Sequence, residues 1–454
     1  MDKEPAGLLL ALAISLFCLG CTAAGTDPPK NGGIAPAETA QAYVVFAWND
    51  LGMHCLNPSY DTAVILPPYN TVNAQVLKRG DPPELVTSGV TVSYALVDNS
   101  YSVGKGQFGQ FWTYMMSLFG KSQADNIGLA GKGLSGTMDW VGADGVYRAV
   151  GIPVVPRTDS APLVRAPYQQ AVITVRDGAG QVIASTKATV PTSDEINCAK
   201  CHAPGASIQA SFQDILDKHD ALSSTNLAAA KPVLCASCHS SPALGTPLQA
   251  GIPYLSASIH GFHATRGASC LDCHPGATTL CNRSLAHTSS DGNCTSCHES
   301  MQVVASSIAA GRVPWQTEPA CGSCHLSPTQ ATLTRIPSPG LSSIPEVNTG
   351  AALDRTSKGH GGLSCTACHS SPHAMVPSRE AKDNFQALAY QGKAVTIGSC
   401  GACHPSSQGR GAAEFMDTHG GPNPEEFSAC AVCHTAVPSA DIQLWPHGFA
   451  WKPR

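Results

Sequence analysis

One short motif of sulfur and nitrogen ligands, Cys-x-x-Cys-His, recurs eight times from residue 198 onward in this chain of 454 residues. This spacing is the signature of covalent haem attachment, in which both thiols form thioethers with the vinyl groups of one porphyrin. The adjacent histidine then gives an imidazole nitrogen to the iron. The motif residues are Cys198, Cys201 and His202; Cys235, Cys238 and His239; Cys270, Cys273 and His274; Cys294, Cys297 and His298; Cys321, Cys324 and His325; Cys365, Cys368 and His369; Cys400, Cys403 and His404; and Cys430, Cys433 and His434.

Two other chemistries use paired cysteines, and both leave the recurring histidine unexplained. A zinc site needs four ligands and does not require this histidine in every copy. A disulfide framework suits an exported protein but uses no histidine. We therefore predict eight covalently attached haem c groups, each with its iron, as the cofactors. All eight motifs lie within residues 198–434, a density that brings neighbouring porphyrins close together.

Histidines outside the motifs are numerous enough to cap the irons. The chain has 17 histidines, and nine of them lie outside the motifs, one more than eight irons need. We therefore predict mostly bis-histidine ligation, with Met301 and Met375 as less favoured ligands. The candidate distal ligands are His54, His219, His260, His263, His287, His360, His373, His419 and His447.

Spacing predicts how several of these histidines are held. Apolar residues recur four and seven positions after Ile208, which places His219 on the inward face of a short helix. His260 and His263 would face nearly the same way on a helix, and would then stand between two adjacent haems. His263 and His287 each lie seven residues before the first cysteine of a motif, from where they could bind a neighbouring haem.

Three residues outside the motifs have two interpretations each. His54 follows the sequence Asp50-Leu51-Gly52-Met53 and is either a distal ligand that crosses the boundary or a local structural residue. Cys55 and Cys281 lack motif partners. They are either buried thiols or a mutual disulfide, which spacing alone does not decide.

The amino-terminal residues predict export. Residues 8–20 are apolar but too few to span a bilayer, as in the apolar part of a signal peptide. A small residue before Cys21 predicts a bacterial lipoprotein site, with ordinary cleavage near Ala23 as the alternative. We assign residues 1–21 to the signal and residues 22–41, rich in alanine, glycine and proline, to a flexible tether.

Two compositions meet near residue 191 and predict two domains. The first, residues 42–190, is a haem-free, mainly-β domain resembling a sandwich, and the second, residues 191–454, is an octahaem cytochrome c domain. The second domain should consist of short helices and loops with little regular structure. In the first domain we expect strands at 43–48 and 90–97, a hairpin of 171–175 with 182–189, and one helix over 108–119.

Charge and composition limit the classes of molecule that the chain can bind and the kind of core that it can form. The formal net charge is −5, charged residues make up 13%, and no basic run is present, which excludes nucleic acid as a partner. Aromatic residues make up only 6%, whereas Gly 43 and Pro 34 are abundant. Such a chain builds a large side-chain core poorly, so the haems themselves are expected to supply much of the packing.

By these motifs the chain resembles the multihaem, octahaem c-type cytochromes of metal-respiring bacteria. The resemblance rests on the eight motifs, the spare histidines and the lipoprotein-like start, and covers roughly residues 198–447. It implies electron transfer to an extracellular acceptor, with other redox proteins as donor and acceptor, and self-assembly in some members. It also implies an outer-membrane or cell-surface location, with the periplasm as alternative and a lipid on Cys21 as the membrane contact.

Three functions remain open at this point. An electron conduit has every iron six-coordinate and has no catalytic residues. An octahaem oxidoreductase of the nitrite, hydroxylamine or tetrathionate type needs one open iron. No motif has lysine in place of histidine and no long carboxy-terminal helical region is evident, so the conduit is favoured. A filament-forming structural cytochrome overlaps with the conduit.

Overall fold

The computed structural model describes residues 42–80, 83–276, 278–285, 287, 292–317, 319, 354–356, 358 and 362–404, without the side chain of Cys400. All of these belong to one compact unit of the chain, Glu38–Arg454. The predicted signal, lipid site and tether lie outside the described residues. So do the motifs that begin at Cys321 and Cys430, and the spare histidines His360, His419 and His447.

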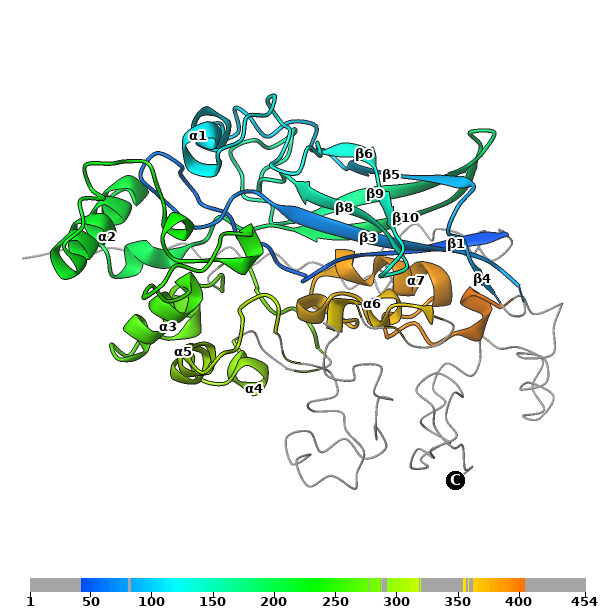
Figure 1. The fold of residues 1–454 in the computed structure, drawn as a ribbon. Helices are drawn as coiled ribbons and strands as arrows, with labels where there is room; N and C mark the ends of the chain where they lie inside the picture. Colours follow the sequence, from blue (N-terminus) through cyan, green and yellow to red (C-terminus); the bar gives the residue numbers. More distant parts are fainter. Residues whose placement is uncertain are drawn as a thin grey trace, which may run out of the picture. The chain divides into compact units, whose positions relative to one another are not determined.

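The amino-terminal region is mainly β, as predicted (Figure 1). The first sheet has the order β1 (Tyr43–Asn49), β3 (Asn70–Lys78), β8 (Val146–Ile152) and β7 (Asp139–Val141), with β4 (Glu84–Leu85) on β3. The second has the order β10 (Val182–Pro191), β9 (Tyr168–Asp177), β5 (Val90–Leu96) and β6 (Ser135–Thr137). A short parallel pair joins β2 (Ala63–Val64) to β11 (Val233–Leu234), which belongs to the next region.

The expected hairpin is confirmed as β9 and β10, which pair antiparallel. The turn forms because the Asp177 carboxylate accepts hydrogen bonds from the backbone N–H groups of Ala179 and Gln181, both at 2.9 Å. Gly180 supplies the positive φ of 82° that this tight turn needs. The expected strand at 90–97 is β5, whose burial alternates along the chain as a pleat with one buried face requires.

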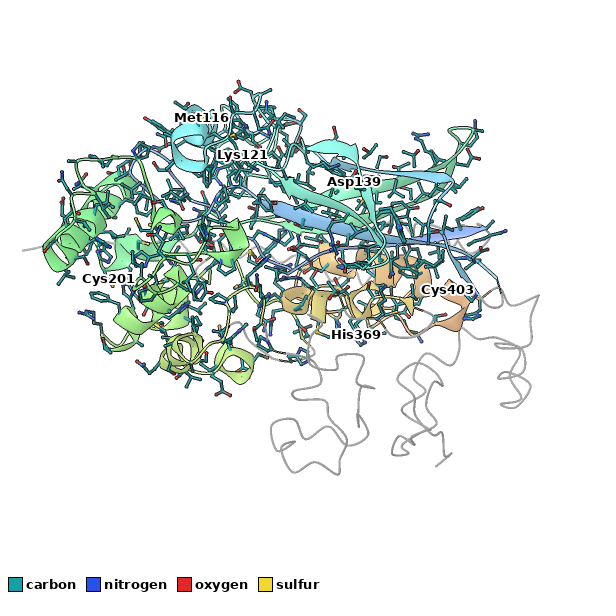
Figure 2. The ribbon with its side chains drawn as sticks, in the orientation of Figure 1. Met116, Lys121, Asp139, Cys201, His369 and Cys403 are labelled. Atoms are coloured by element: carbon teal, nitrogen blue, oxygen red, sulfur yellow. The ribbon has the colours of Figure 1, made fainter. Side chains whose placement is uncertain are left out.

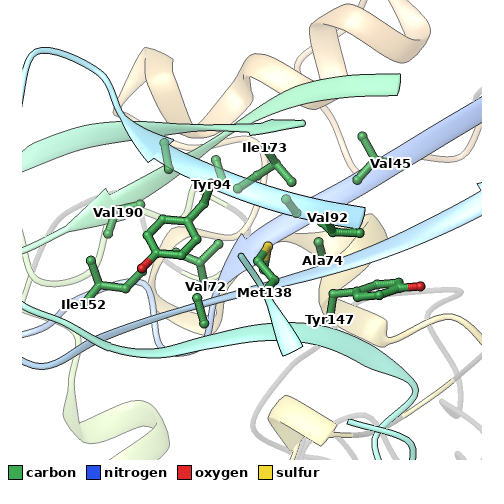
Figure 3. Close-up of a cluster of buried hydrophobic side chains, with 14 of the residues drawn as sticks. Val45, Val72, Ala74, Val92, Tyr94, Met138, Tyr147, Ile152, Ile173 and Val190 are labelled. Atoms are coloured by element: carbon green, nitrogen blue, oxygen red, sulfur yellow. The ribbon is translucent and has the colours of Figure 1, made fainter. Parts of the chain in front are cut away.

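Apolar side chains from both sheets form one core (Figure 3). Val72 and Ala74 of β3 contribute from the first sheet, and Val92, Tyr94 and Ile173 from the second. Each of these side chains is at most 2% exposed. Fully burying a side chain of valine size contributes about 1.5–3 kcal/mol, so this cluster is the main stabilising feature of the β region.

Strand β1 is buried on both of its faces, which explains its continuous apolar run. Val45 and Ala47 point into the core between the sheets. Phe46 and Trp48 point the other way, toward α7 (Phe385–Gln391), where the rings of Phe46 and Tyr390 lie 5.3 Å apart. The β sheet therefore serves as a platform for part of the following region.

The expected helix is confirmed as α1 (Gln110–Phe119), which begins two residues later than predicted. Phe111, Met115 and Leu118 form its buried face. The helix ends at Gly120, whose φ of 63° is left-handed and whose N–H donates to the Met116 carbonyl at 3.0 Å.

Beyond the second sheet the described chain consists of short helices, 3₁₀ turns and loops, as predicted. The α-helices are α2 (Ile208–Ser223), α3 (Leu255–Ala264), α4 (Thr295–His298), α5 (Met301–Ala309), α6 (Cys365–His369) and α7. The 3₁₀ turns are η2 (Asn197–Lys200), η3 (Cys235–Ser237), η4 (Pro242–Leu244), η5 (Cys270–Asp272), η8 (Asp354–Thr356), η10 (Pro372–Ala374), η11 (Ala381–Asn384) and η12 (Cys400–Ala402). No helix among the described residues has both the length and the apolar character needed to cross a membrane.

A glycine contact in the β region gives a first testable prediction. A Cβ atom on Gly128 would overlap the carbonyl oxygen of Gly151. We expect Gly128→Ala to lower the free energy of unfolding by about 1–3 kcal/mol, as overpacking does. Gly178→Ala is the matched control, because nothing lies within 4 Å of its Cβ position. Denaturant titration of both variants tests this, and equal stability of the two would contradict it.

Candidate functional site

The motif cysteines and histidines are brought together by single tight turns. In the copies that begin at Cys198, Cys235, Cys270 and Cys294, the histidine N–H donates to the carbonyl of the first cysteine at 2.9 or 3.0 Å. The copy at Cys365 forms the whole of α6. Residues three and four apart share one face of a helical turn. Each of these five motifs therefore presents both thiols and the imidazole on the same side of the chain.

The described motifs lie in two parts of the structure (Figure 2). Cys201 lies with α2 and α3, whereas His369 and Cys403 lie with α6 and α7 beneath the β sheet. Helix α2 begins at a capping residue, Ser207, whose hydroxyl accepts from the Ala210 N–H at 3.2 Å. This cap sets the start of α2. The helix carries His219, so the helix expected at that position is confirmed.

Four motif histidines each face one histidine from outside the motifs. The ring centroids are 6.1–6.4 Å apart in all four pairs. The pairs are His202 with His263, His239 with His219, His274 with His260, and His298 with His373.

The spacing of these rings matches that of two imidazoles on one metal ion. An imidazole nitrogen binds a metal ion at about 2 Å and lies about 1.1 Å from its ring centre, so opposed ligands have centroids about 6.2 Å apart. Each pair supplies only two ligands. Among the described residues no group of three or more histidine, cysteine or acidic side chains could hold a metal ion. An ion held by such a pair would need its remaining ligands from elsewhere.

Hydrogen bonds at Nδ1 fix the orientation of six of the eight paired rings. Carbonyl and carboxylate oxygens only accept, and the Thr225 hydroxyl already donates to Asp220 at 2.6 Å, so each Nδ1 carries the hydrogen. In the tautomer that this hydrogen bond selects, Nε2 is the ring nitrogen whose lone pair can bind a metal ion. The Nδ1 partners are Asp214 Oδ2 at 2.8 Å for His202, Thr225 Oγ1 at 2.9 Å for His219, and the carbonyl oxygens of Pro253 at 3.1 Å for His239, Ser256 at 2.7 Å for His260, Ile259 at 2.8 Å for His263 and Leu51 at 2.8 Å for His373.

Burial keeps several of these rings neutral. It lowers the pKa of His274 to about 4, with a further contribution from the neighbouring His260, His298 and His373. Burial also lowers the pKa of His260 and of His298. The neutral imidazole is the form that coordinates metal ions, so the protein holds these rings ready for coordination at neutral pH.

Two helices each connect two of the pairs. Helix α3 carries both His260 and His263, as the sequence predicts, and these face the motifs at Cys270 and Cys198. The same two motifs touch directly, because the Asn197 N–H donates to the Cys273 carbonyl at 3.3 Å. Helix α2 holds Asp214 against His202 and His219 against His239.

The structure places His54 in a local contact. Its Nε2 lies 2.6 Å from Asp50 Oδ1, and its carbonyl accepts from the Ser193 N–H at 2.8 Å. This arrangement corresponds to the local structural alternative. Burial raises the pKa of the adjacent Cys55 thiol, and Cys281 and Glu195 raise it further, so the two non-motif cysteines are neighbours.

For the other site residues predicted from the sequence, the structure describes part of the surroundings. The His287 side chain is exposed overall, and desolvation by the atoms around its ring lowers its pKa. In the copy at Cys365, His369 Nδ1 lies 3.4 Å from the Thr396 hydroxyl. The copy at Cys400 is described through Cys403 and His404, both partly buried. The partners of these motifs stay predictions.

Sequence reasoning missed two groups that orient candidate ligands. Asp214 holds His202, and the Leu51 carbonyl holds His373. A single acidic residue in a helix gives no sequence signal of such a role. A backbone carbonyl gives none either, although Leu51 lies in the Asp50–Cys55 element that the sequence singled out.

No protein-family model, curated protein or solved structure matches this chain. Its function is therefore inferred from its own motifs and from the geometry of the paired histidines.

Proposed function

We propose that this chain is a multihaem c-type cytochrome that passes electrons along closely packed bis-histidine haems. Four pairs of opposed imidazoles at 6.1–6.4 Å carry this proposal. The two histidines of each pair would hold one iron, and the two cysteines of the motif would attach one porphyrin covalently. When bound, the haem would supply one-electron redox chemistry, and the protein would hold and orient it.

The same geometry favours a conduit over an enzyme. In each of the four pairs two imidazoles would hold the iron, so that a substrate would have to displace a histidine to reach it. Bis-histidine ligation favours ferric iron relative to methionine–histidine ligation, so low reduction potentials are expected. The octahaem oxidoreductase and the filament-forming structural cytochrome remain the alternatives.

The shared helices support an order for four of the proposed haems. Helix α2 contacts the sites at Cys235 and Cys198, and α3 contacts those at Cys198 and Cys270. The site at Cys294 follows, because His298 is a charge neighbour of His274. We therefore propose the path Cys235, Cys198, Cys270, Cys294, which differs from the order of the motifs in the sequence.

We propose further that the β region is a two-layer sandwich that binds no haem and supports the haem region. The shared core of its two sheets and the packing of α7 on β1 support this role. We also propose that the protein is exported and held at the outer membrane or cell surface by a lipid on Cys21. Other redox proteins would be its donor and acceptor, with self-assembly as a further mode of contact.

Haem content and spin state test the proposal. We expect the mass of the purified protein to include eight haems, one for each motif. Optical and electron paramagnetic resonance spectra of the ferric protein should show low-spin iron only. Cys238→Ala, which removes one thioether, is the control for the assignment of haem to motif. A stoichiometric high-spin signal would overturn the pure conduit and favour an enzyme, and a protein without haem would overturn both.

A further inference from the structure

The ligand histidine of the first motif has a charged acceptor at its Nδ1. Asp214 Oδ2 lies 2.8 Å from His202 Nδ1, and the side chains of the two residues are only 28% and 20% exposed. Asp214 reaches this position because it lies on α2, which packs against η2, the turn that begins the motif. The contact is therefore built by the packing of helix on motif.

The other oriented rings have neutral acceptors. His239, His260, His263 and His373 donate to backbone carbonyls. His219 reaches a carboxylate only through the hydroxyl of Thr225. Of these six described rings, His202 is thus the one whose Nδ1 partner is a carboxylate oxygen. Hydrogen bonds to an ionised acceptor are roughly twice as strong as neutral ones, so this ring carries the most electron density.

A more basic imidazole stabilises ferric iron, which carries more positive charge than ferrous iron. Lys218 opposes this effect, because its ammonium group contacts the same carboxylate oxygen of Asp214 one helical turn away. The negative charge that acts on His202 is thus set by the balance between these two residues of α2.

We propose that Asp214 lowers the reduction potential of the haem attached at Cys198 and Cys201, and that Lys218 limits this effect. The inference rests on the proposed function. The haem at Cys198 lies between those at Cys235 and Cys270 in the proposed path. In that path the haem at Cys198 would be one that Asp214 makes harder to reduce.

Two variants of the full haem-loaded protein test the proposal through shifts of opposite sign. We expect Asp214→Asn to raise the reduction potential of one haem by about 59 mV, which lowers its ferric-to-ferrous ratio about tenfold at a fixed applied potential. Lys218→Gln should lower the potential of the same haem. Asp217→Asn is the matched control, because Asp217 lies on the same helix but contacts Gln213, at 2.8 Å. Potentiometric titration followed by paramagnetic resonance resolves the haem concerned.

The outcomes separate this inference from the proposed function. A wild-type protein that lacks haem by mass would overturn the proposed function itself. If all variants retain their haems and Asp214→Asn shifts no potential, or shifts it downward, the tuning role of Asp214 is overturned alone. Shifts of the same sign for Asp214→Asn and Lys218→Gln would also overturn it. Opposite shifts of one haem, with Asp217→Asn unchanged, would support it.

Discussion

His263→Ala is expected to convert one of the eight proposed haems from low-spin to high-spin while the others stay low-spin. The ring of His263 faces that of His202 at 6.4 Å, so its removal opens one axial position on the proposed iron at Cys198. Paramagnetic resonance of the ferric protein measures the change. Added imidazole should restore the low-spin signal, because it replaces the missing side chain without altering the fold.

Two control variants make this result specific. His260→Ala, on the same helix, should remove a ligand from a different haem, the one at Cys270, and make that haem high-spin. The double variant of His260 and His263 should make two haems high-spin. His54→Ala should leave every haem low-spin, because the Nε2 of His54 contacts Asp50. A high-spin signal from His54→Ala, or none from His263→Ala, would contradict the pairing.

Arg283→Met is expected to destabilise the protein by about 3–5 kcal/mol, as the loss of one partner from a buried ion pair does. Arg283 donates to both carboxylate oxygens of Asp383, at 2.8 and 3.2 Å, and to the Gly52 carbonyl at 2.8 Å. The side chains of Arg283 and Asp383 are 0% and 1% exposed. Methionine would fill the space but leave Asp383 as a buried charge without its partner.

Denaturant unfolding of Arg283→Met and of a control variant, each compared with wild type, measures the change in stability. Arg266→Met is the matched control, because Arg266 is exposed, and we expect it to change stability by less than about 0.5 kcal/mol. The double variant Arg283→Met with Asp383→Asn should recover part of the loss, since no charge is then left unpaired. Equal effects of Arg283→Met and Arg266→Met would show that the buried pair contributes little.

The Arg283 contacts also bear on a candidate ligand. The backbone N–H of Arg283 donates to the His373 carbonyl at 2.7 Å, and His373 donates from Nδ1 to Leu51, next to Gly52. The loop from the β region and the segment at Arg283 thus hold His373 from two sides. Loss of the ion pair should therefore also weaken the alignment of His373 with His298.

Local features of this protein follow from its sequence alone. The spacing of Cys198, Cys201 and His202 suffices to bring two thiols and an imidazole onto one turn, because the contacts span only four residues. The alternation around Val92 and the turn at Asp177 predicted a strand and a hairpin for the same reason. These interactions are short-range, so neighbouring residues determine them.

The tertiary structure decided which groups meet across longer distances. His263 lies just before one motif but faces His202 of another, because α3 contacts both motifs. Asp214 reaches His202 only through the docking of α2, and Leu51 reaches His373 only where the β region meets the region of short helices. Residue type and spacing predict that a histidine can bind iron. Its partner depends on how separate segments pack together, which local spacing does not encode.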